Sequence, residues 1–280
     1  MVVNQIKTVV LLALLTALLL FVGQLIGGYN GLVIAGIFAV IMNFGSYWFS
    51  DKIILMMYRA KEVKDNNHQL YKIVKEVAEK ANVPVPRVYI IPSDASNAFA
   101  TGRSPKKAAV AATQGIMSLL NGEELKGVMA HEISHVKNRD TLISTVAGTI
   151  AGVISYIATM AQWSAMFGGR DRNGSSNIVG LLVLAIVTPI IATIIQLAIS
   201  RSREYLADAG GAKIVGNGEH LAKALEKLHD DVKAHPMRLG NQATSHLFIS
   251  NPFRNAGFLN LSSTHPDMNI RVQKLRNMKF

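Results

Sequence analysis

His131-Glu132-Ile133-Ser134-His135 lies near the middle of this 280-residue chain. Residues four apart share one face of a helix, so both imidazoles can reach one metal ion, with Glu132 beside it. This spacing is typical of the two-histidine half of a zinc hydrolase site. Alternatively, the stretch holds two surface histidines and a solvated glutamate.

The residues around this motif predict a helix over about 122–138. Asn121 is suited to cap the start of the helix, and Glu123 and Glu124 suit its first turn. An apolar stripe at helical spacing follows, formed by Leu125, Val128, Met129 and Ile133. The motif therefore falls in the buried middle of the helix, where histidines without a partner are costly and a metal ion would satisfy them.

The composition indicates a membrane protein. Half of the residues are hydrophobic and only 17% are charged, a low share for a soluble domain. Four uncharged stretches each have about the 20 residues that cross a bilayer core: residues 8–28, 32–50, 141–163 and 178–200. The first follows Lys7 as the apolar part of a signal peptide would. It runs on too long and a second span follows at once, so we expect a retained anchor.

The four spans pair into two hairpins, over residues 1–50 and 141–200. Residues 29–31 alone connect the first two spans. Of the 29 lysines and arginines, only Arg170 and Arg172 lie in a loop that would face outward. This positive-inside pattern predicts a multi-pass membrane protein with both termini and the polar regions in the cytoplasm.

The net charge of +11 is explained by this pattern and by attraction to anionic lipid. No basic motif with interleaved aromatic residues is present, so we expect no nucleic-acid partner. The chain has no cysteine. A metal ion would therefore be held by nitrogen and oxygen donors, without thiolates.

The polar regions 51–140 and 201–280 are expected to form one cytoplasmic domain that the second hairpin splits. Apolar periodicity predicts helices over 67–81, 202–215, 220–232 and 269–277. Strands are predicted over 87–91, 96–101 and 108–113. A small sheet would lie against the motif helix. The predicted fold class is a mainly α membrane protein: four transmembrane helices with a cytoplasmic α+β domain.

A catalytic zinc ion takes three protein ligands and keeps one position open for water. The strongest carboxylate candidate for the third ligand is Glu204. It lies just after the fourth span, and the histidine motif lies just before the third, so the hairpin formed by these two spans would bring them together. Asp208 lies four residues on, on the same face, and could orient a ligating histidine. Alternatively, Glu204 is solvated and pairs with Arg201 or Arg203.

Several segments resemble the HtpX family of bacterial membrane-bound zinc metallopeptidases, a heat-shock protease family that also includes the CAAX prenyl endopeptidase. They are Asn97-Ala98-Phe99-Ala100-Thr101-Gly102, the histidine motif, Ser202-Arg203-Glu204-Tyr205-Leu206-Ala207-Asp208, Ser245-His246-Leu247-Phe248-Ile249 and Ser263-Thr264-His265-Pro266. They cover most of the chain in the family's order. The resemblance implies a zincin-like domain, a bacterial inner-membrane location and quality control of membrane proteins under stress.

The resemblance also implies roles for individual residues. His131, His135 and Glu204 would hold one Zn²⁺ per chain, and Glu132 would act as general base and then acid. His265 would stabilise the oxyanion, while Arg271 would pair with Asp208 or Glu204. An edge strand would bind the substrate backbone through Asn97, Ala98, Phe99, Ala100 and Thr101. Without the resemblance, that strand is a routine sheet strand, and His265 and Arg271 are a helix start and a solvated arginine.

The leading hypothesis is a zinc metalloendopeptidase that cleaves unfolded or damaged membrane proteins at the cytoplasmic face, with homo-oligomers possible. The first alternative is a non-catalytic, zinc-stabilised membrane scaffold or holdase, which would need a closed metal site with a fourth protein ligand. The second is a metal transporter, which would need ionisable residues inside the spans. The predicted spans hold only neutral polar residues such as Gln24, Asn43 and Gln196.

Overall fold

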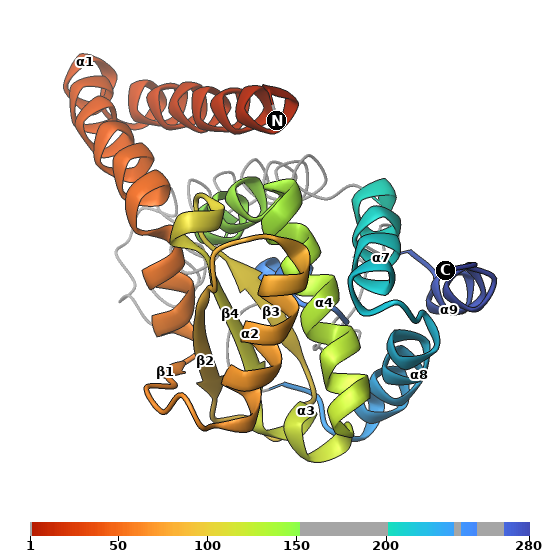
Figure 1. The fold of residues 1–280 in the computed structure, drawn as a ribbon. Coiled ribbons are helices and arrows are strands. Elements are labelled where there is room, and N and C mark those ends of the chain that lie inside the picture. The colour runs from red at the N-terminus through yellow and green to blue at the C-terminus, as the bar shows by residue number, and fades with distance from the viewer. Residues whose placement is uncertain (1, 152–200, 238–241, 251–265) are drawn as a thin grey trace.

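The computed structural model describes residues 2–151, 201–237, 242–250 and 266–280 (Figure 1). In these ranges a small sheet is covered on both faces. Helices α2 (Gln69–Ala81) and α4 (Gly122–Asn138) cover one face. The C-terminal end of α1 (Val2–Met57) covers the other, together with residues 244–250, here named the covering segment. The covering segment includes the end of the 3-10 helix η2 (Gln242–Leu247).

The sheet has the strand order β1-β2-β4-β3. The strands are β1 (Lys61–Glu62), β2 (Arg87–Ile91), β3 (Ala98–Thr101) and β4 (Ala109–Thr113). β2 and β4 are parallel, and β3 is antiparallel to β4 with Ala100 opposite Val110. The three predicted strands are confirmed. β1 was not predicted, because two exposed charged residues give no alternating pattern. β3 is an edge strand of the sheet.

Each predicted helix of the polar regions is present. Short elements η1 (Pro105–Lys107) and α3 (Gln114–Leu119) flank β4. Helices α7 (Arg201–Val215), α8 (Glu219–Ala234) and α9 (Met268–Arg276) follow. Figure 1 shows α4 between the sheet and α7, and both α7 and α8 pack against α4. The two polar regions, far apart in sequence, therefore meet along α4.

α1 folds back on itself at Gly27 and Gly28, where the backbone leaves the helical conformation. Gly28 has a φ of 53°, in the left-handed region that glycine enters without steric cost. The two arms then touch at Gly23 and Gly31, where neither residue has room for a Cβ atom. The turn thus lies before the predicted connection at residues 29–31, because Gly28 supplies the left-handed backbone.

Among the described residues, one helix is long and apolar enough to cross a membrane: the second arm of α1, Gly27–Met57. Two apolar helices are shorter, Thr8–Phe21 and Thr141–Ala151, and they pack together through Leu11, Leu15, Ile143 and Ile150. The rest of the third predicted span and the whole of the fourth lie outside the described residues. Four transmembrane helices therefore stay a prediction, and the last turn of α1 extends past residue 50 to reach the sheet.

Candidate metal centre

Helix α4 carries the histidine motif, and its ends are fixed by local interactions. The Asn121 side chain accepts a hydrogen bond from the Glu124 backbone N–H, and the Glu124 carboxylate accepts one from the Asn121 N–H. This reciprocal cap sets where the helix begins. As a result, His131 and Glu132 face the protein interior with 1% and 2% of their surface exposed.

Helix α7 approaches α4 closely enough to deliver a carboxylate. A Cβ atom on Gly211 would lie 2.8 Å from the His131 backbone nitrogen, and one on Gly210 would overlap the Ser134 side chain. These two glycines let the helix backbones come together in a way that larger residues would prevent. Glu204, about two turns before them, and Asp208, less than one turn before them, therefore face the motif.

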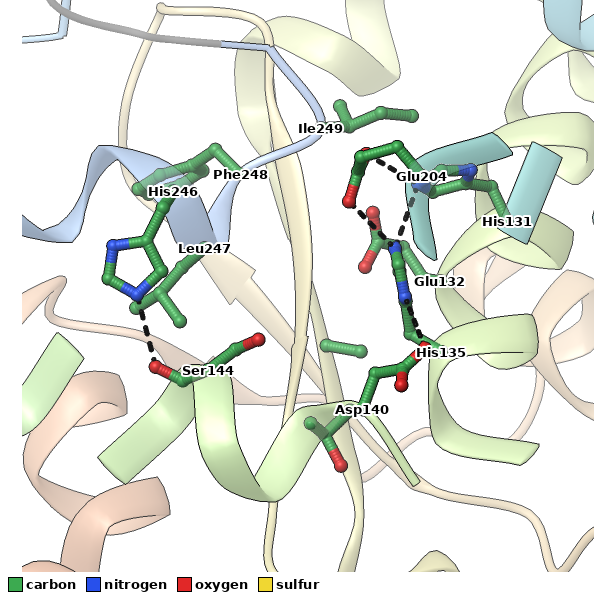
Figure 2. Close-up of a pocket in the computed structure, with 12 residues that line it drawn as sticks. His131, Glu132, His135, Asp140, Ser144, Glu204, His246, Leu247, Phe248 and Ile249 are labelled. Carbon is green, nitrogen blue, oxygen red and sulfur yellow. Dashed lines mark hydrogen bonds and ion pairs between the residues drawn. The ribbon is translucent and has the colours of Figure 1, made fainter. Parts of the chain in front are cut away.

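The side chains of His131, His135 and Glu204 point toward one another (Figure 2). The two Nε2 atoms lie 3.2 Å apart. The Glu204 carboxylate oxygens lie 3.4 Å from the His135 Nε2 and 3.7 Å from the His131 Nε2. Ligands held about 2.0–2.2 Å from a tetrahedral zinc ion lie roughly 3.3–3.6 Å from one another. The donor set N, N, O and its spacing therefore fit a zinc ion.

Asp208 and Arg271 support the first imidazole. A carboxylate oxygen of Asp208 lies 2.9 Å from the His131 Nδ1. Arg271, fully buried, donates two hydrogen bonds of 2.8 Å to the same carboxylate. Burial opposes ionisation, but the guanidinium outweighs it and holds the pKa of Asp208 at about 2. Arg271 also lies 3.8 Å from Glu204, so it reaches both acidic groups with which we predicted it to pair.

His135 has a second carboxylate behind it. Its Nδ1 lies 3.3 Å from a carboxylate oxygen of Asp140. Burial works against the charged form of His135, but the hydrogen bonds to Asp140 and Glu204 outweigh it and raise its pKa to about 10. The direction of this shift reflects a local excess of negative charge. A divalent cation would satisfy that charge in place of a proton.

Glu132 lies beside the cluster formed by His131, His135 and Glu204 but is not a member of it. Burial raises the pKa of its carboxyl, while the charges of His131 and His135 and a hydrogen bond from the Ala100 backbone lower it. A carboxylate that is poorly solvated and close to a cation site is suited to accept a proton from water.

The cavity in front of these residues is small, at about 30 Å³. That is room for roughly two water molecules and not for a peptide. One wall is the motif with Glu204, and the other is Ala100 with residues 246–249 of the covering segment. In Figure 2 the His246 ring points away from the metal ligands, toward the Ser144 carbonyl oxygen at 3.1 Å.

The covering segment lies along the open edge of β3. The Ile249 N–H donates to the Ala98 carbonyl at 3.1 Å, and the Asn97 side chain donates to the Ser250 carbonyl at 2.6 Å. The Phe99 ring is buried against Phe248 on the other face of the sheet. Among the five residues predicted to bind substrate, only Ala100 lines the cavity.

The other predicted site residues divide into two groups. The structure brings together Asp208 and Arg271, whereas His265 lies outside the described residues. Sequence reasoning missed Asp140, although a carboxylate five residues after a ligating histidine is visible in the sequence. It also missed the role of Gly210 and Gly211 in α7. Two adjacent glycines inside a predicted helix are unusual and indicate close packing, so the sequence did carry a signal.

The chain is similar to a known peptidase family and to several named proteins. Residues 64–279 match peptidase family M48. A protein of Desulforapulum autotrophicum called Protease HtpX homolog is 52% identical over 278 residues, covering 98% of this chain and 90% of that protein. A protein of the same name from Pyrococcus furiosus is 51% identical over 276 residues, covering 98% and 95%.

A third relative called Protease HtpX homolog, from Aquifex aeolicus, is 51% identical over 265 residues, covering 92% of this chain and 87% of that protein. Among solved structures, the crystal structure of S. mikatae Ste24p aligns with a TM-score of 0.51 at 19% identity. It covers 98% of this chain, which spans 66% of that one. That similarity indicates a shared fold.

Proposed function

The chain belongs to peptidase family M48 and is a membrane metalloprotease; from this premise we propose a zinc-dependent endopeptidase that cleaves misfolded or damaged membrane proteins at the cytoplasmic face. One observation carries the hydrolytic part of the proposal. Two imidazole nitrogens and a carboxylate converge within 4.8 Å of one another, with the Glu132 carboxylate beside them.

The proposed metal ligands are His131, His135 and Glu204, with one zinc ion per chain. A bound zinc ion supplies a Lewis acid that polarises the scissile carbonyl and lowers the pKa of water toward about 7. Three protein donors leave a position open, whereas a structural zinc site is closed by four. Among the described residues, this cluster has three members, which favours a catalytic site over a scaffold.

Glu132 is the proposed general base. Its carboxylate accepts a proton from the attacking water and then returns it to the leaving amine. Glu132 lines the same cavity as His131 and His135. His265 is proposed to stabilise the oxyanion of the tetrahedral intermediate, on the strength of the family's His-Pro segment.

Substrate binding is proposed at the main chain of β3. In an antiparallel ladder, alternate residues direct both backbone groups to the same side. Ala98 bonds outward to Ile249, so Ala100 also faces the open side. Backbone pairing with an extended peptide is nearly independent of side chains, so it suits unfolded segments of varied sequence. The approach of a peptide requires more than the present cavity of about 30 Å³, so a wall of the cavity has to move.

Membrane insertion with a cytoplasmic active site is supported by the charge distribution and by α1. Its second arm exposes Phe44, Trp48 and Phe49 toward the surroundings. Cations lie over two of these rings: Arg103 is 4.0 Å from the Trp48 centroid and Lys52 is 5.6 Å from that of Phe49. Aromatic residues beside basic ones are typical of the membrane–water interface. We propose that the catalytic domain lies directly beneath this level.

The test compares wild type with Glu132→Gln, using the full chain in detergent. The variant should keep one zinc ion per chain and lose casein cleavage by about 10²- to 10⁴-fold, because only the proton acceptor is removed. Glu123→Gln is the control: it lies on the same helix with more than half of its side chain exposed. Equal cleavage by wild type and Glu132→Gln would remove the mechanism. A zinc-bound wild type that cleaves nothing would favour the scaffold.

A further inference from the structure

Asp140 occupies the junction between α4 and the apolar helix Thr141–Ala151. Arg139, just before it, adopts a left-handed backbone conformation with a φ of 59° and ends α4. The Asp140 N–H donates to the His135 carbonyl at 3.0 Å, while the Asp140 carbonyl accepts from the Ser144 N–H at 3.4 Å. One residue thus belongs to the end of one helix and the start of the next.

The reversal at Arg139 turns the Asp140 side chain back toward α4. Its Oδ2 lies 3.3 Å from the Nδ1 of His135, on the opposite side of the ring from the Nε2 that faces His131 and Glu204. A carboxylate accepts only, so the proton of a neutral His135 lies on Nδ1. Its Nε2 lone pair then faces the other two ligand atoms.

The second oxygen of Asp140 faces Arg203. Arg203 Nε lies 3.8 Å from Asp140 Oδ1, and both side chains are largely buried, with 12% and 9% of their surface exposed. The arrangement repeats the one behind the other imidazole, where Asp208 lies between His131 and Arg271. Each ligating histidine therefore has a carboxylate behind it, and each carboxylate has an arginine.

We propose that Asp140, held by Arg203, is a positioning residue that orients His135 for a divalent cation. The proposal rests on the metal function proposed above. Asp140 is the last residue before the helix Thr141–Ala151, and Arg203 lies in the first turn of α7. The orientation of His135 therefore depends on the two junctions between the polar domain and the second predicted membrane hairpin, one before residue 141 and one after residue 200.

A simple structural role makes a different prediction, and substitutions separate the two. Asp, Asn and Ser all cap helix starts well, whereas Ala does not. If Asp140 only starts the helix after it, Asp140→Ser should behave as wild type. If Asp140 orients His135, Asp140→Ser should lose zinc affinity as Asp140→Ala does, because serine is too short to reach the ring. Asp140→Asn keeps the volume and an acceptor but removes the charge, so its loss should be smaller.

The experiment measures zinc dissociation constants of the full chain in detergent by competition with a chromophoric chelator. We expect a 10- to 100-fold weaker constant for Asp140→Ser, as is usual when the partner of a ligating histidine is removed. The absorption bands of the cobalt(II)-loaded protein should shift in the same variant. Thermal unfolding of the metal-free forms reports on folding separately. Glu123→Gln, which removes a carboxylate 3.6 Å from the surface residue His220, is the matched control.

Each outcome decides between the ideas. Wild-type zinc affinity and an unchanged cobalt spectrum in Asp140→Ser would overturn the role of Asp140 and leave the proposed function intact. Failure of the wild type to bind zinc would overturn both. Should Asp140→Ser not fold, Asp140→Asn decides: it has to bind zinc more weakly than wild type while its metal-free form unfolds at the same temperature.

Discussion

The backbone N–H of Ile249 donates to the carbonyl oxygen of Ala98 at 3.1 Å, so the chain itself occupies part of the sheet edge that faces the site. Both side chains lie in the same buried cluster on the helix-covered face. On the opposite face, the ring centroids of Phe99 and Phe248 lie 5.2 Å apart. The covering segment therefore follows β3 with the alternation of a paired strand.

This pairing predicts that fixing the covering segment will stop peptide cleavage. Neighbouring strand residues lie at distances that a disulfide can bridge, and the chain has no cysteine of its own. We expect oxidised Ala98→Cys/Ile249→Cys protein to keep its zinc and to lose casein cleavage by about tenfold or more, since a cavity of about 30 Å³ excludes a peptide. Reductant should restore cleavage.

The two single-cysteine variants, treated with the same oxidant, control for the substitutions. If the oxidised double variant cleaves casein as fast as the reduced one, the covering segment is a fixed wall of the groove. Peptides would then have to enter past another part of the site.

Arg271 should be essential for stability as well as for the site. It is fully buried, bonds both oxygens of Asp208, and donates to the Ile249 carbonyl at 3.2 Å. Arg271→Met leaves the Asp208 charge buried without its partner, and removal of one member of such a pair costs about 3–5 kcal/mol. The measurement is thermal unfolding of the full chain in detergent, with zinc content determined in parallel.

Arg271→Met/Asp208→Asn should recover part of that loss, because the second substitution removes the unpaired charge. Arg276→Met is the matched control. Arg276 bonds Glu219 and Glu226 at the surface, and a solvated pair contributes little. A drop in the unfolding temperature as large for Arg276→Met as for Arg271→Met would contradict this account.

The parts of the fold that were predicted correctly depend on local interactions. Helix α4 begins at its predicted cap and places His131 and His135 on one buried face, because helical periodicity follows from sequence spacing alone. Sequence spacing alone does not place Glu204 at the site, because its position depends on how closely α7 approaches α4. That approach is set where Gly210 and Gly211 meet α4, and the Gly-Gly pair in the sequence does not reveal which helix it contacts.

Asp140 was missed for a related reason. Five residues after His135, it would lie off the ligand face if α4 continued. It reaches the ring only because Arg139 adopts a left-handed conformation, which is uncommon for a residue with a side chain and is not marked in the sequence. The pairing of the covering segment with β3 was not predicted either, because it joins residues far apart in the chain.

The contact between α4 and α7 predicts a specific effect at Gly211. Gly211→Ala places a Cβ atom 2.8 Å from the His131 backbone nitrogen, so α7 has to move away and carry Glu204 with it. We expect weaker zinc binding, by about tenfold or more, together with a lower unfolding temperature. The readouts are the zinc dissociation constant and thermal unfolding.

Gly122→Ala is the control: it makes the same substitution in α4, at a glycine that does not contact α7. Its nearest neighbour would be the Gln69 side chain at 3.8 Å, an ordinary contact, so the substitution should be neutral or slightly stabilising. Normal zinc affinity in Gly211→Ala would show that the helix spacing does not set the position of Glu204.

Removal of the metal should destabilise the polar domain, because the ligands come from both of its halves. His131 and His135 lie on α4 and Glu204 lies on α7, so a bound ion crosslinks the two polar regions. A ligand present at 100 times its dissociation constant stabilises the folded state by about 2.7 kcal/mol.

Chelation should lower the unfolding temperature, and added zinc should restore it. Magnesium should not restore it, because imidazole ligands bind magnesium poorly. Glu132→Gln should keep the zinc-dependent shift and His131→Ala should lose it; a shift that persists in His131→Ala would place the stabilising ion elsewhere.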